Sequence, residues 1–358
     1  MESIDIKGFK SIKELHLPLK PINILIGGNG SGKSNFLSFF ELLQNIYRKN
    51  LQGYVALNGG VDKFLYNGSE VTQEIEGKLT FPTNTYSFIL KKSENSFVFS
   101  KEIFGFNQNN IDNNAEKTNF STETYLHSLG MPRAKFIKEY LEEVRKYHFH
   151  DTGKNSPFHQ MSNIRTDYLH LYSNGSNIAA LLYKIKQDKG EGEESKVYQR
   201  ILRTIQSVAP YFLDFILKPN ENDYIELLWC NKFSEQVYNS YNFSDGTLRF
   251  IALTVLLLQP KLPKTIIIDE PELGLHPFAI AKLSGLIKSA SQRDCQIIVA
   301  TQSVELINYF KPEDVITVDY KNGESIFERL NEKSLAIWLE DFSLGELWKG
   351  NFINGQPF

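Results

Sequence analysis

The sequence predicts an α/β fold with a mixed central sheet, an antiparallel β-subdomain and a helical lobe. Three observations support it. The apolar run "INILIG" leads into the glycine-rich "GGNGSGKS" and then into a stretch with helical periodicity. The runs "TIIIDE" and "IIVATQS" are short, apolar and end in polar residues, as buried parallel strands do. Between these segments lie stretches that alternate apolar and polar residues, which is typical of antiparallel strands.

The first third of the chain is predicted to be mainly sheet. "SIDIKGF", "ELHLPL" and "INILIG" are expected to form strands, and a helix is expected from Lys33 to about Arg48. Residues 53–104 alternate apolar and polar side chains in short runs such as "EIEGKLTF" and "SFVFSKEI", which favours an antiparallel sheet with one wet face. The Asn-rich stretch 105–119 is expected to be a loop.

The middle of the chain is predicted to be helical. "AKFIKEYLEEVRKY" has apolar residues at three-to-four spacing, and "SNIAALLYKIKQ" and "SKVYQRILRTIQSV" are expected to be two more helices, split by the acidic turn "DKGEGEES". Strands near "YFLDFILK" and "DYIELLWC" follow, then helices from about Asp245 and after Pro277 that alternate with the two buried strands. This gives three segments: an N-terminal lobe, 1–104, a helical insert, 105–210, and a C-terminal lobe, 211–358.

Composition narrows the function classes. The 358 residues are 41% hydrophobic, which suffices for a packed core, and the net charge of −3 means that any nucleic-acid contact needs a local basic patch. Cys230 and Cys295 have no metal-type spacing and are expected to be reduced thiols. The N-terminus does not resemble a signal peptide, and the longest near-apolar run, Phe250 to Leu258, is too short to span a bilayer. We therefore expect a cytoplasmic protein that makes no membrane contact.

The stretch Gly27 to Ser34 matches G-x-x-x-x-G-K-[ST] and stands between a predicted strand and a predicted helix, as this phosphate-binding motif requires. Glycines let backbone amides turn toward phosphate oxygens, and Lys33 adds a full positive charge. The hydroxyl of Ser34 is suited to Mg²⁺. A chance glycine-rich turn is the alternative, and the strand and helix context disfavours it. The predicted phosphate contacts are Asn29, Gly30, Ser31, Gly32, Lys33, Ser34 and Asn35.

"TIIIDEPELGLHP" is a buried strand that ends in two adjacent carboxylates. Ligands of open α/β sheets bind at the carboxyl ends of strands, so Asp269 is expected to hold Mg²⁺ and Glu270 to polarise an attacking water. An acidic helix cap is a plausible alternative for Glu272. In "IIVATQS", Gln302 follows the next strand and either contributes to the same chemistry or only ends the strand.

"NFSDGTLRF" places Ser244, Asp245 and Gly246 at the start of an apolar helix. Serine and aspartate are preferred N-caps, so these residues alone indicate no more than an ordinary helix start. The order of the motifs along the chain adds the missing information. A phosphate loop, a serine-glycine signature, an acidic strand end and a polar residue after the next strand follow one another, with the signature 23 residues before Ile267 in the acidic strand.

This ordered set resembles that of ABC-type ATPases of the RecF/SMC-like branch. The chain is particularly similar to stand-alone prokaryotic "AAA family" ATPases related to the ATPase components of OLD-type and other anti-phage systems. The resemblance covers nearly the whole chain and rests on "FKSIKELHLPL", "GGNGSGKSNFL", "YHFHDTG", "GSNIAALLYKIK", "FSDGTLRF", "IIIDEPELGLHP", "ATQSVELI" and "LGELWKGNFINGQP".

The resemblance implies an ATP-dependent head-to-tail homodimer, with ATP and Mg²⁺ held between the phosphate loop of one copy and Ser244, Asp245 and Gly246 of the other. It implies that Lys10 contacts nucleotide phosphate and that Gln160 corresponds to the glutamine that helps to hold Mg²⁺. Gln302 takes the position where the family most often has a histidine that contacts the γ-phosphate. The catalytic residues implied are Lys33, Glu270 and Gln302.

Two departures separate the chain from its better-known relatives. Asp245 stands where most ABC ATPases have glycine after the signature serine, and 210 residues separate Ser34 from Ser244, more than in transporter ATPases and fewer than in SMC proteins. OLD-type nucleases carry a C-terminal nuclease domain, whereas the 88 residues after Glu270 contain no Asp-x-Asp pair. We therefore expect any nuclease to be a separate protein.

The leading expectation is an ATPase that serves as a switch or clamp for a partner effector in anti-phage defence or DNA repair. One alternative is a DNA-binding clamp with a slow regulatory ATPase, and a transport ATPase subunit is a less favoured one. The basic residues available for DNA are Arg133, Lys135, Lys138, Arg145 and Lys146. His148, His150 and His159 raise the alternative of a metal site, but without an evident fourth ligand a structural role is favoured.

Overall fold

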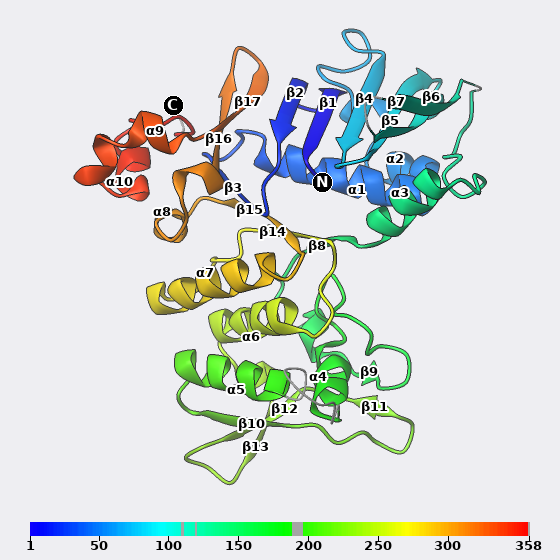
Figure 1. Cartoon of the computed structure of the whole chain (residues 1–358). Helices are drawn as coiled ribbons and strands as arrows, with labels where there is room; N and C mark the ends of the chain where they lie inside the picture. Colours follow the sequence, from blue (N-terminus) through cyan, green and yellow to red (C-terminus); the bar gives the residue numbers. More distant parts are fainter. Residues whose placement is uncertain (109–110, 119, 188–195, 357–358) are drawn as a thin grey trace. The chain divides into compact units, whose positions relative to one another are not determined.

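The computed structural model describes residues 1–108, 111–118, 120–187 and 196–356, with side chains described outside 107–114. Two compact units make up the chain (Figure 1). The first comprises Met1–Lys146 and Lys311–Phe358, and the second comprises Tyr147–Phe310. These boundaries differ from those of the three predicted segments, whose assignment to ATPase lobes remains a prediction.

An antiparallel sheet of six strands in the order β2-β1-β4-β5-β6-β7 is the largest element of the first unit. Ile4 and Ile6 of β1 are buried on one face, while Asp5 and Lys7 point to the other, so the residues alternate as predicted. The six strands of this sheet are β1 (Ser3–Phe9), β2 (Ile12–Pro18), β4 (Glu74–Thr80), β5 (Asn84–Ser93), β6 (Ser96–Gln108) and β7 (Ile111–Lys117).

Helix α1 (Lys33–Tyr47) packs an aromatic face on this sheet. The ring of Phe39 lies edge-on to Phe9, with centroids 5.3 Å apart, and stacks on Phe88 of β5 at 6.2 Å. All three side chains are at most 1% exposed, and burying each contributes roughly 2–3 kcal/mol relative to exposure. The other helices of this unit are α2 (Leu51–Leu57), α3 (Pro132–Glu142), α9 (Glu332–Leu335) and α10 (Leu344–Lys349), with 3₁₀ turns at Val61–Lys63, Pro312–Asp314 and Trp338–Glu340.

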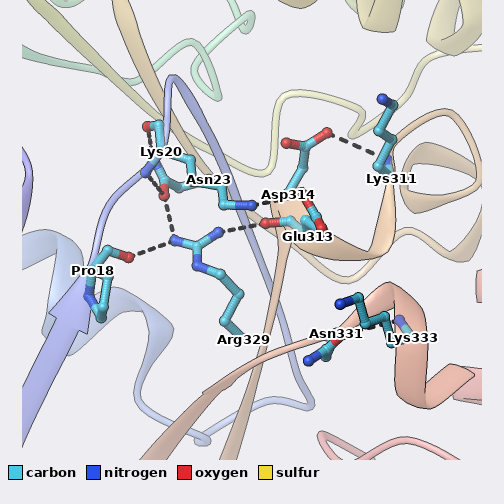
Figure 2. Close-up of polar contacts among 9 residues, drawn as sticks. All are labelled: Pro18, Lys20, Asn23, Lys311, Glu313, Asp314, Arg329, Asn331 and Lys333. Carbon is cyan, nitrogen blue, oxygen red and sulfur yellow. Dashed lines mark hydrogen bonds and ion pairs between the residues drawn. The ribbon is translucent and has the colours of Figure 1, made fainter.

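A mixed arrangement of strands leads into the phosphate loop. β3 (Ile22–Ile26) pairs in parallel with β16 (Val315–Lys321), which pairs antiparallel with β17 (Glu324–Arg329). The guanidinium of Arg329 donates to the carbonyls of Pro18 and Glu313, both at 2.8 Å, and to Oδ1 of Asn23 at 2.6 Å (Figure 2). These bonds fix the start of β3. Lys20 Nζ reaches Glu313 at 2.8 Å in the same cluster.

The second unit has helices around the nearly fully buried α6 (Asp245–Leu258). Its parallel strands β14 (Thr265–Asp269) and β15 (Gln296–Thr301) pair in register, Ile267 opposite Ile298. Each is buried along its length, as predicted. The other helices are α4 (Ile178–Gln187), α5 (Val197–Val208), α7 (Pro277–Ser291) and α8 (Val304–Ile307), with 3₁₀ turns at Pro157–His159 and Ser240–Asn242.

This unit also contains a three-stranded antiparallel sheet, formed by β10 (Phe212–Ile216), β12 (Leu228–Asn231) and β13 (Val237–Asn239). A two-stranded ladder joins β9 (Ser162–Asn163) and β11 (Tyr224–Ile225). The ring of Trp229 stacks on Phe243 with centroids 4.4 Å apart, which ties this sheet to the segment before α6.

Three predictions of local structure were wrong. Residues 53–73 are not strand, because α2 and a 3₁₀ turn precede the first strand at Glu74. The predicted loop 105–119 is wrong for residues 105–108 and 111–117, which belong to the paired strands β6 and β7. The helix predicted over 134–147 ends at Glu142, and Val144–Tyr147 forms β8. The predicted turn "DKGEGEES" lies outside the described residues.

Candidate active site

The phosphate loop belongs to the first unit and runs from β3 to α1. Gly30 and Gly32 have φ of +77° and +111°, in the left-handed region that glycine adopts without a penalty. A side chain on Gly32 would also collide with Ser325 of β17, and one on Gly27 with the carbonyl of Val318. These three glycines of the motif are therefore required by the fold as well as by a phosphate.

Lys33 opens α1 and is only 6% exposed. Its ammonium donates to the carbonyl oxygens of Gly27 at 2.6 Å and Gly28 at 2.9 Å. The Oγ of Ser31 is buried and has no hydrogen-bond partner among the described residues. A buried hydroxyl without a partner is costly, and an anionic oxygen in the loop would satisfy it. Asn29, Gly30 and Ser34 are exposed beside it.

The hydroxyl groups of Ser11 and Ser325 form a hydrogen-bonded chain that reaches the backbone of the phosphate loop. The Oγ of Ser325 lies 2.7 Å from both Ser31 O and Ser11 Oγ, so it donates to the carbonyl of Ser31 while the Ser11 hydroxyl can donate to it. Asn35 Nδ2 donates to Ser11 Oγ at 2.7 Å. Sequence reasoning missed Ser11 and Ser325, because only the fold brings them under the motif.

Lys10 immediately precedes Ser11 in the turn between β1 and β2 and has φ of +50°. Its Nζ lies 5.5 Å from the ring centroids of both Phe9 and Phe64. Burial lowers the pKa of Lys10, and the charge of Glu41 partly opposes this shift. The turn is thus linked to the phosphate loop through Ser11, while a phosphate contact by Lys10 remains a prediction.

The two acidic residues of the second motif follow β14 in the second unit. The carbonyl oxygen of Asp269 is 2.9 Å from Nε2 of His150. Glu270 has φ of +42°, a left-handed conformation that costs a non-glycine residue roughly 1–2 kcal/mol. Its amide donates to Ala300 O of β15 at 2.8 Å, which holds this conformation in place. Such strain at the end of a buried strand is common in active sites.

Gln302, after β15, donates a hydrogen bond from its side-chain amide to Oε1 of Glu270. The structure therefore brings these two predicted catalytic residues together. The carboxylate of Glu272 accepts from the hydroxyl of Thr301 and, at 3.4 Å, from the backbone N–H of Gln302. Burial raises the pKa of Glu272. Glu272 does not cap the next helix, since the ring of His276 takes that place by accepting from Phe278 N at 3.2 Å.

The signature residues start α6 in the same unit. Ser244 is the N-cap and accepts from Thr247 N at 3.3 Å, and both Ser244 and Asp245 are exposed. A side chain on Gly246 would meet the carbonyl of Gly274, so the loop after β14 packs directly on the start of α6. The serine is thus an N-cap, as its residue type alone indicated, in an exposed position that leaves it accessible to a ligand.

Arg249 of α6 bonds to the segment at residues 149–150 and to the loop after β14, and sequence reasoning missed it. It is 5% exposed and donates to three carbonyl oxygens, those of Phe149 at 2.9 Å, His150 at 3.3 Å and Leu273. Burial lowers its pKa, an effect that Asp245 partly opposes. The signal was a lone arginine in the otherwise apolar helix "LRFIALTVLLL".

The remaining predicted residues are spread over other surfaces. Gln160 is exposed at the end of a 3₁₀ turn of the second unit. His148 and His150 stack at 4.2 Å, whereas His159 contacts Ser240 Oγ at 2.7 Å and stacks on Tyr241. Among the residues that the structure describes, no three His, Cys, Asp or Glu side chains are grouped as metal ligands.

Three of the five basic residues considered for DNA have partners within the chain. Lys146 Nζ is 2.8 Å from Glu41, and Lys135 lies 3.8 Å from Glu139 on α3. Arg133 points its Nε at the sulfur of Met131, 3.1 Å away. No helix in the described part of the chain is long and apolar enough to cross a membrane.

The fold and motifs define a P-loop NTPase of the ABC/SMC-head type. The chain belongs to the family described as "AAA domain, putative AbiEii toxin, Type IV TA system", whose model matches residues 22–308. It is 24% identical over 382 residues to the Old nuclease of Escherichia phage P2, across 93% of this chain and 61% of that protein. The chain thus spans less than two thirds of this relative.

Solved structures with the same fold include SMC heads. One is the Smc head bound to the C-winged helix domain of ScpA, with 17% identity, a TM-score of 0.55 and coverage of 94% of this chain and 99% of that one. Another is the Smc head with an extended coiled coil bound to the C-terminal domain of ScpA derived from Pyrococcus furiosus, with 15% identity, a TM-score of 0.54 and coverage of 95% and 98%. The predicted fold class is therefore confirmed: the chain has the SMC-head fold within the AAA family that its family model defines, and it is related in sequence to the Old nuclease.

Proposed function

We propose that this chain binds and hydrolyses ATP with Mg²⁺, and that ATP closes a head-to-tail homodimer that serves as a switch or clamp for a separately encoded effector in anti-phage defence or DNA repair. The observation that carries the proposal is the hydrogen bond from Gln302 to Glu270 at the ends of two paired parallel strands, in a chain that also holds a complete phosphate loop.

The phosphate loop is suited to the triphosphate. Its amides and the N-terminus of α1 favour anions, and the unpartnered Ser31 hydroxyl supplies a further donor. Phosphate oxygens would replace the Gly27 and Gly28 carbonyls as partners of Lys33. Ser34 and Asp269 are the residues proposed to hold Mg²⁺, which would neutralise charge on the phosphates; Gln160 and Lys10 are the less specific assignments.

Hydrolysis needs a group that orients the attacking water and a hydrogen-bond donor that contacts the γ-phosphate. Glu270 is proposed for the first role, and its fixed backbone keeps the carboxylate at the end of β14. Gln302 is proposed for the second, because its amide can exchange Glu270 for a phosphate oxygen while its own oxygen accepts from water. Ser244, Asp245 and Gly246 would meet the γ-phosphate of the other copy.

The comparisons support a partner without naming it. The related Old protein is a nuclease longer than this chain, and the SMC heads were solved with a piece of ScpA. We infer that this ATPase likewise acts on another protein, such as a nuclease. The paired state of Lys135 and Lys146 gives no support to the alternative of a DNA-binding clamp.

Glu270→Gln tests the proposal. The variant should bind ATP with wild-type affinity, hydrolyse it at least about 100-fold more slowly and accumulate as dimers in ATP, measured by phosphate release and light scattering. Glu94→Gln is a matched control, because Glu94 is also a glutamate with positive φ but lies in an exposed turn. Unchanged hydrolysis, or no ATP-dependent dimer of Glu270→Gln, would contradict the proposal.

A further inference from the structure

The segment from α9 to α10, at the red end of the chain in Figure 1, exposes a cluster of large apolar side chains. Ile337 is 81%, Trp338 44%, Phe342 41% and Phe352 56% exposed. The ring of Trp338 lies 4.9 Å from Phe352 and 6.5 Å from Phe342, centroid to centroid, so these residues form one surface. We call these four residues the aromatic patch. Contiguous exposed apolar surface of this kind marks interaction sites.

The charges around the aromatic patch indicate what it binds. From the start of α9 to Phe352 the charged side chains are Glu332, Lys333, Glu340, Asp341, Glu346 and Lys349, and all six are exposed, so the segment carries a net charge of −2. This net negative charge disfavours binding of the phosphates of DNA and of anionic lipids. A symmetric contact with a second copy would bring two net negative segments together. The surface is complementary to a different protein that presents an apolar anchor flanked by lysine or arginine.

A short segment connects the aromatic patch with the phosphate loop. Residues 353–356, which we call the strap, follow Phe352 directly. The carbonyl of Gly355 accepts from Gly28 N at 2.8 Å, and Gly355 N donates to Asp319 Oδ1 at 2.9 Å. The side chain of Gln356 donates to Trp348 O of α10 at 2.7 Å. One amide of the phosphate loop is therefore bonded to a residue three positions after the aromatic patch.

The strap has little room to shift. Gly355 has φ of +104°, and a Cβ there would lie 3.1 Å from both Ile26 O and Trp348 Nε1. The indole Nε1 of Trp348 is buried and has no partner among the described residues. A change in the loop amide at Gly28 must therefore be accommodated by the strap and by α10, next to the aromatic patch.

We propose that the aromatic patch is the docking surface for the effector protein, bound through an apolar anchor with basic flanks, and that the strap couples this surface to the occupancy of the phosphate loop. The coupling rests on the proposed ATP-binding function, whereas the docking surface does not. Phe352 of the aromatic patch directly precedes the strap, so the two segments are continuous in the chain.

Docking is tested without nucleotide, with a synthetic 18-residue amphipathic peptide of leucine and lysine as the probe. Titration calorimetry at 150 mM salt should show binding to the wild type that Ile337→Ser/Trp338→Ser weakens at least tenfold. Leu57→Ser should change nothing, because Leu57 is an 87% exposed apolar residue of the same unit. A peptide of leucine and glutamate should bind at least tenfold more weakly.

Three results would overturn the docking proposal. One is equal binding of the peptide by both variants. Another is a nucleotide-free dimer, seen by sedimentation, that Ile337→Ser/Trp338→Ser abolishes, which would make the aromatic patch a contact between copies. The third is co-sedimentation with anionic phosphatidylserine vesicles that is lost in the same variant.

Coupling is tested by adding a non-hydrolysable ATP analogue to the peptide titration. The analogue should change the peptide affinity of the wild type at least threefold and leave that of Gly355→Ala unchanged. Gly130→Ala is the control, since a Cβ there meets nothing within 4 Å. An equal nucleotide effect in both variants overturns the coupling. Direct binding of the analogue is measured alongside, so failure of ATP binding itself is recognised separately.

Discussion

The side-chain amide of Gln302 donates a hydrogen bond to the carboxylate of Glu270, across the ends of β15 and β14. The proposed γ-phosphate donor thus contacts the proposed water-orienting group. In the proposed mechanism, ATP would break this contact or share it. Gln302 lies next to Thr301, whose hydroxyl donates to Glu272, so the neighbouring backbone is held while the amide exchanges partners.

Gln302→Ala should lower ATP turnover roughly 100-fold with ATP affinity changed at most a few-fold, because one preorganised donor is lost where charge develops. The amide is neutral, so the wild-type pH profile should lack a histidine-like step from this position. Gln302→His should introduce one near pH 6.5 to about 7. Phosphate release from pH 5.5 to 9 measures both effects.

Gln206→Ala serves as the control, because Gln206 also donates a side-chain hydrogen bond, to Leu213 O at 2.7 Å, but lies on an exposed helix face. Turnover of Gln302→Ala equal to that of this control would show that residue 302 only ends a strand.

Arg249→Met should destabilise the second unit by about 3 kcal/mol, since several buried carbonyls lose their charged donor together. Urea unfolding followed by tryptophan fluorescence measures the loss, and ATP turnover should fall with it because the loop at Leu273 is released. Arg165→Met is the matched control. Arg165 is 76% exposed and pairs with Asp223, so its removal should cost under about 1 kcal/mol. Similar losses in both variants would refute the special role of Arg249.

The sequence sufficed for the parts of the site that local chemistry specifies. The phosphate loop, the acidic strand end and the serine that caps α6 each combine a residue pattern with a strand or helix boundary, and each is found where it was predicted. Gln302 could be placed at a strand end, but its contact with Glu270 depends on the parallel pairing of β14 with β15.

Contacts between distant segments could not be predicted in this way. Arg249 reaches carbonyls about a hundred residues earlier in the chain, and Ser325 supports a loop near residue 31. Local periodicity also failed at residues 144–147, whose apolar spacing continues the helical pattern of α3 although the backbone becomes strand β8. Tertiary packing overrides propensity at such boundaries.

Glu102 provides a pH-dependent test in the antiparallel sheet. It is fully buried, accepts from Tyr86 Oη at 2.7 Å and Tyr125 N at 2.8 Å, and burial raises its pKa above the ordinary value of 4.5. The folded chain therefore binds more protons than the unfolded chain between these two pKa values. The contribution of Glu102 to the free energy of unfolding is therefore greatest below pH 4.5. It is lost as the pH rises through the pKa of Glu102 in the folded chain.

Glu102→Gln removes that dependence. The melting temperature of the wild type minus that of the variant should be largest at pH 4 and smaller at pH 8, measured by scanning calorimetry. Glu74→Gln, an exposed position of the same sheet, should show no such trend. A difference that grows with pH would mean that Glu102 is stabilised as a carboxylate.

Gly246→Ala tests the contact between the signature and the loop after β14. The new Cβ would collide with the carbonyl of Gly274, so either the loop or the start of α6 must move. We expect ATP turnover to fall at least tenfold, with loss of the ATP-dependent dimer in light scattering, because Ser244 and Asp245 would no longer be presented correctly. Gly285→Ala in α7 is the matched control: its Cβ meets nothing within 4 Å, and alanine should raise helix stability by up to about 1 kcal/mol. If Gly246→Ala keeps full turnover while Gly285→Ala behaves as expected, the close approach of Gly274 is not needed for the reaction.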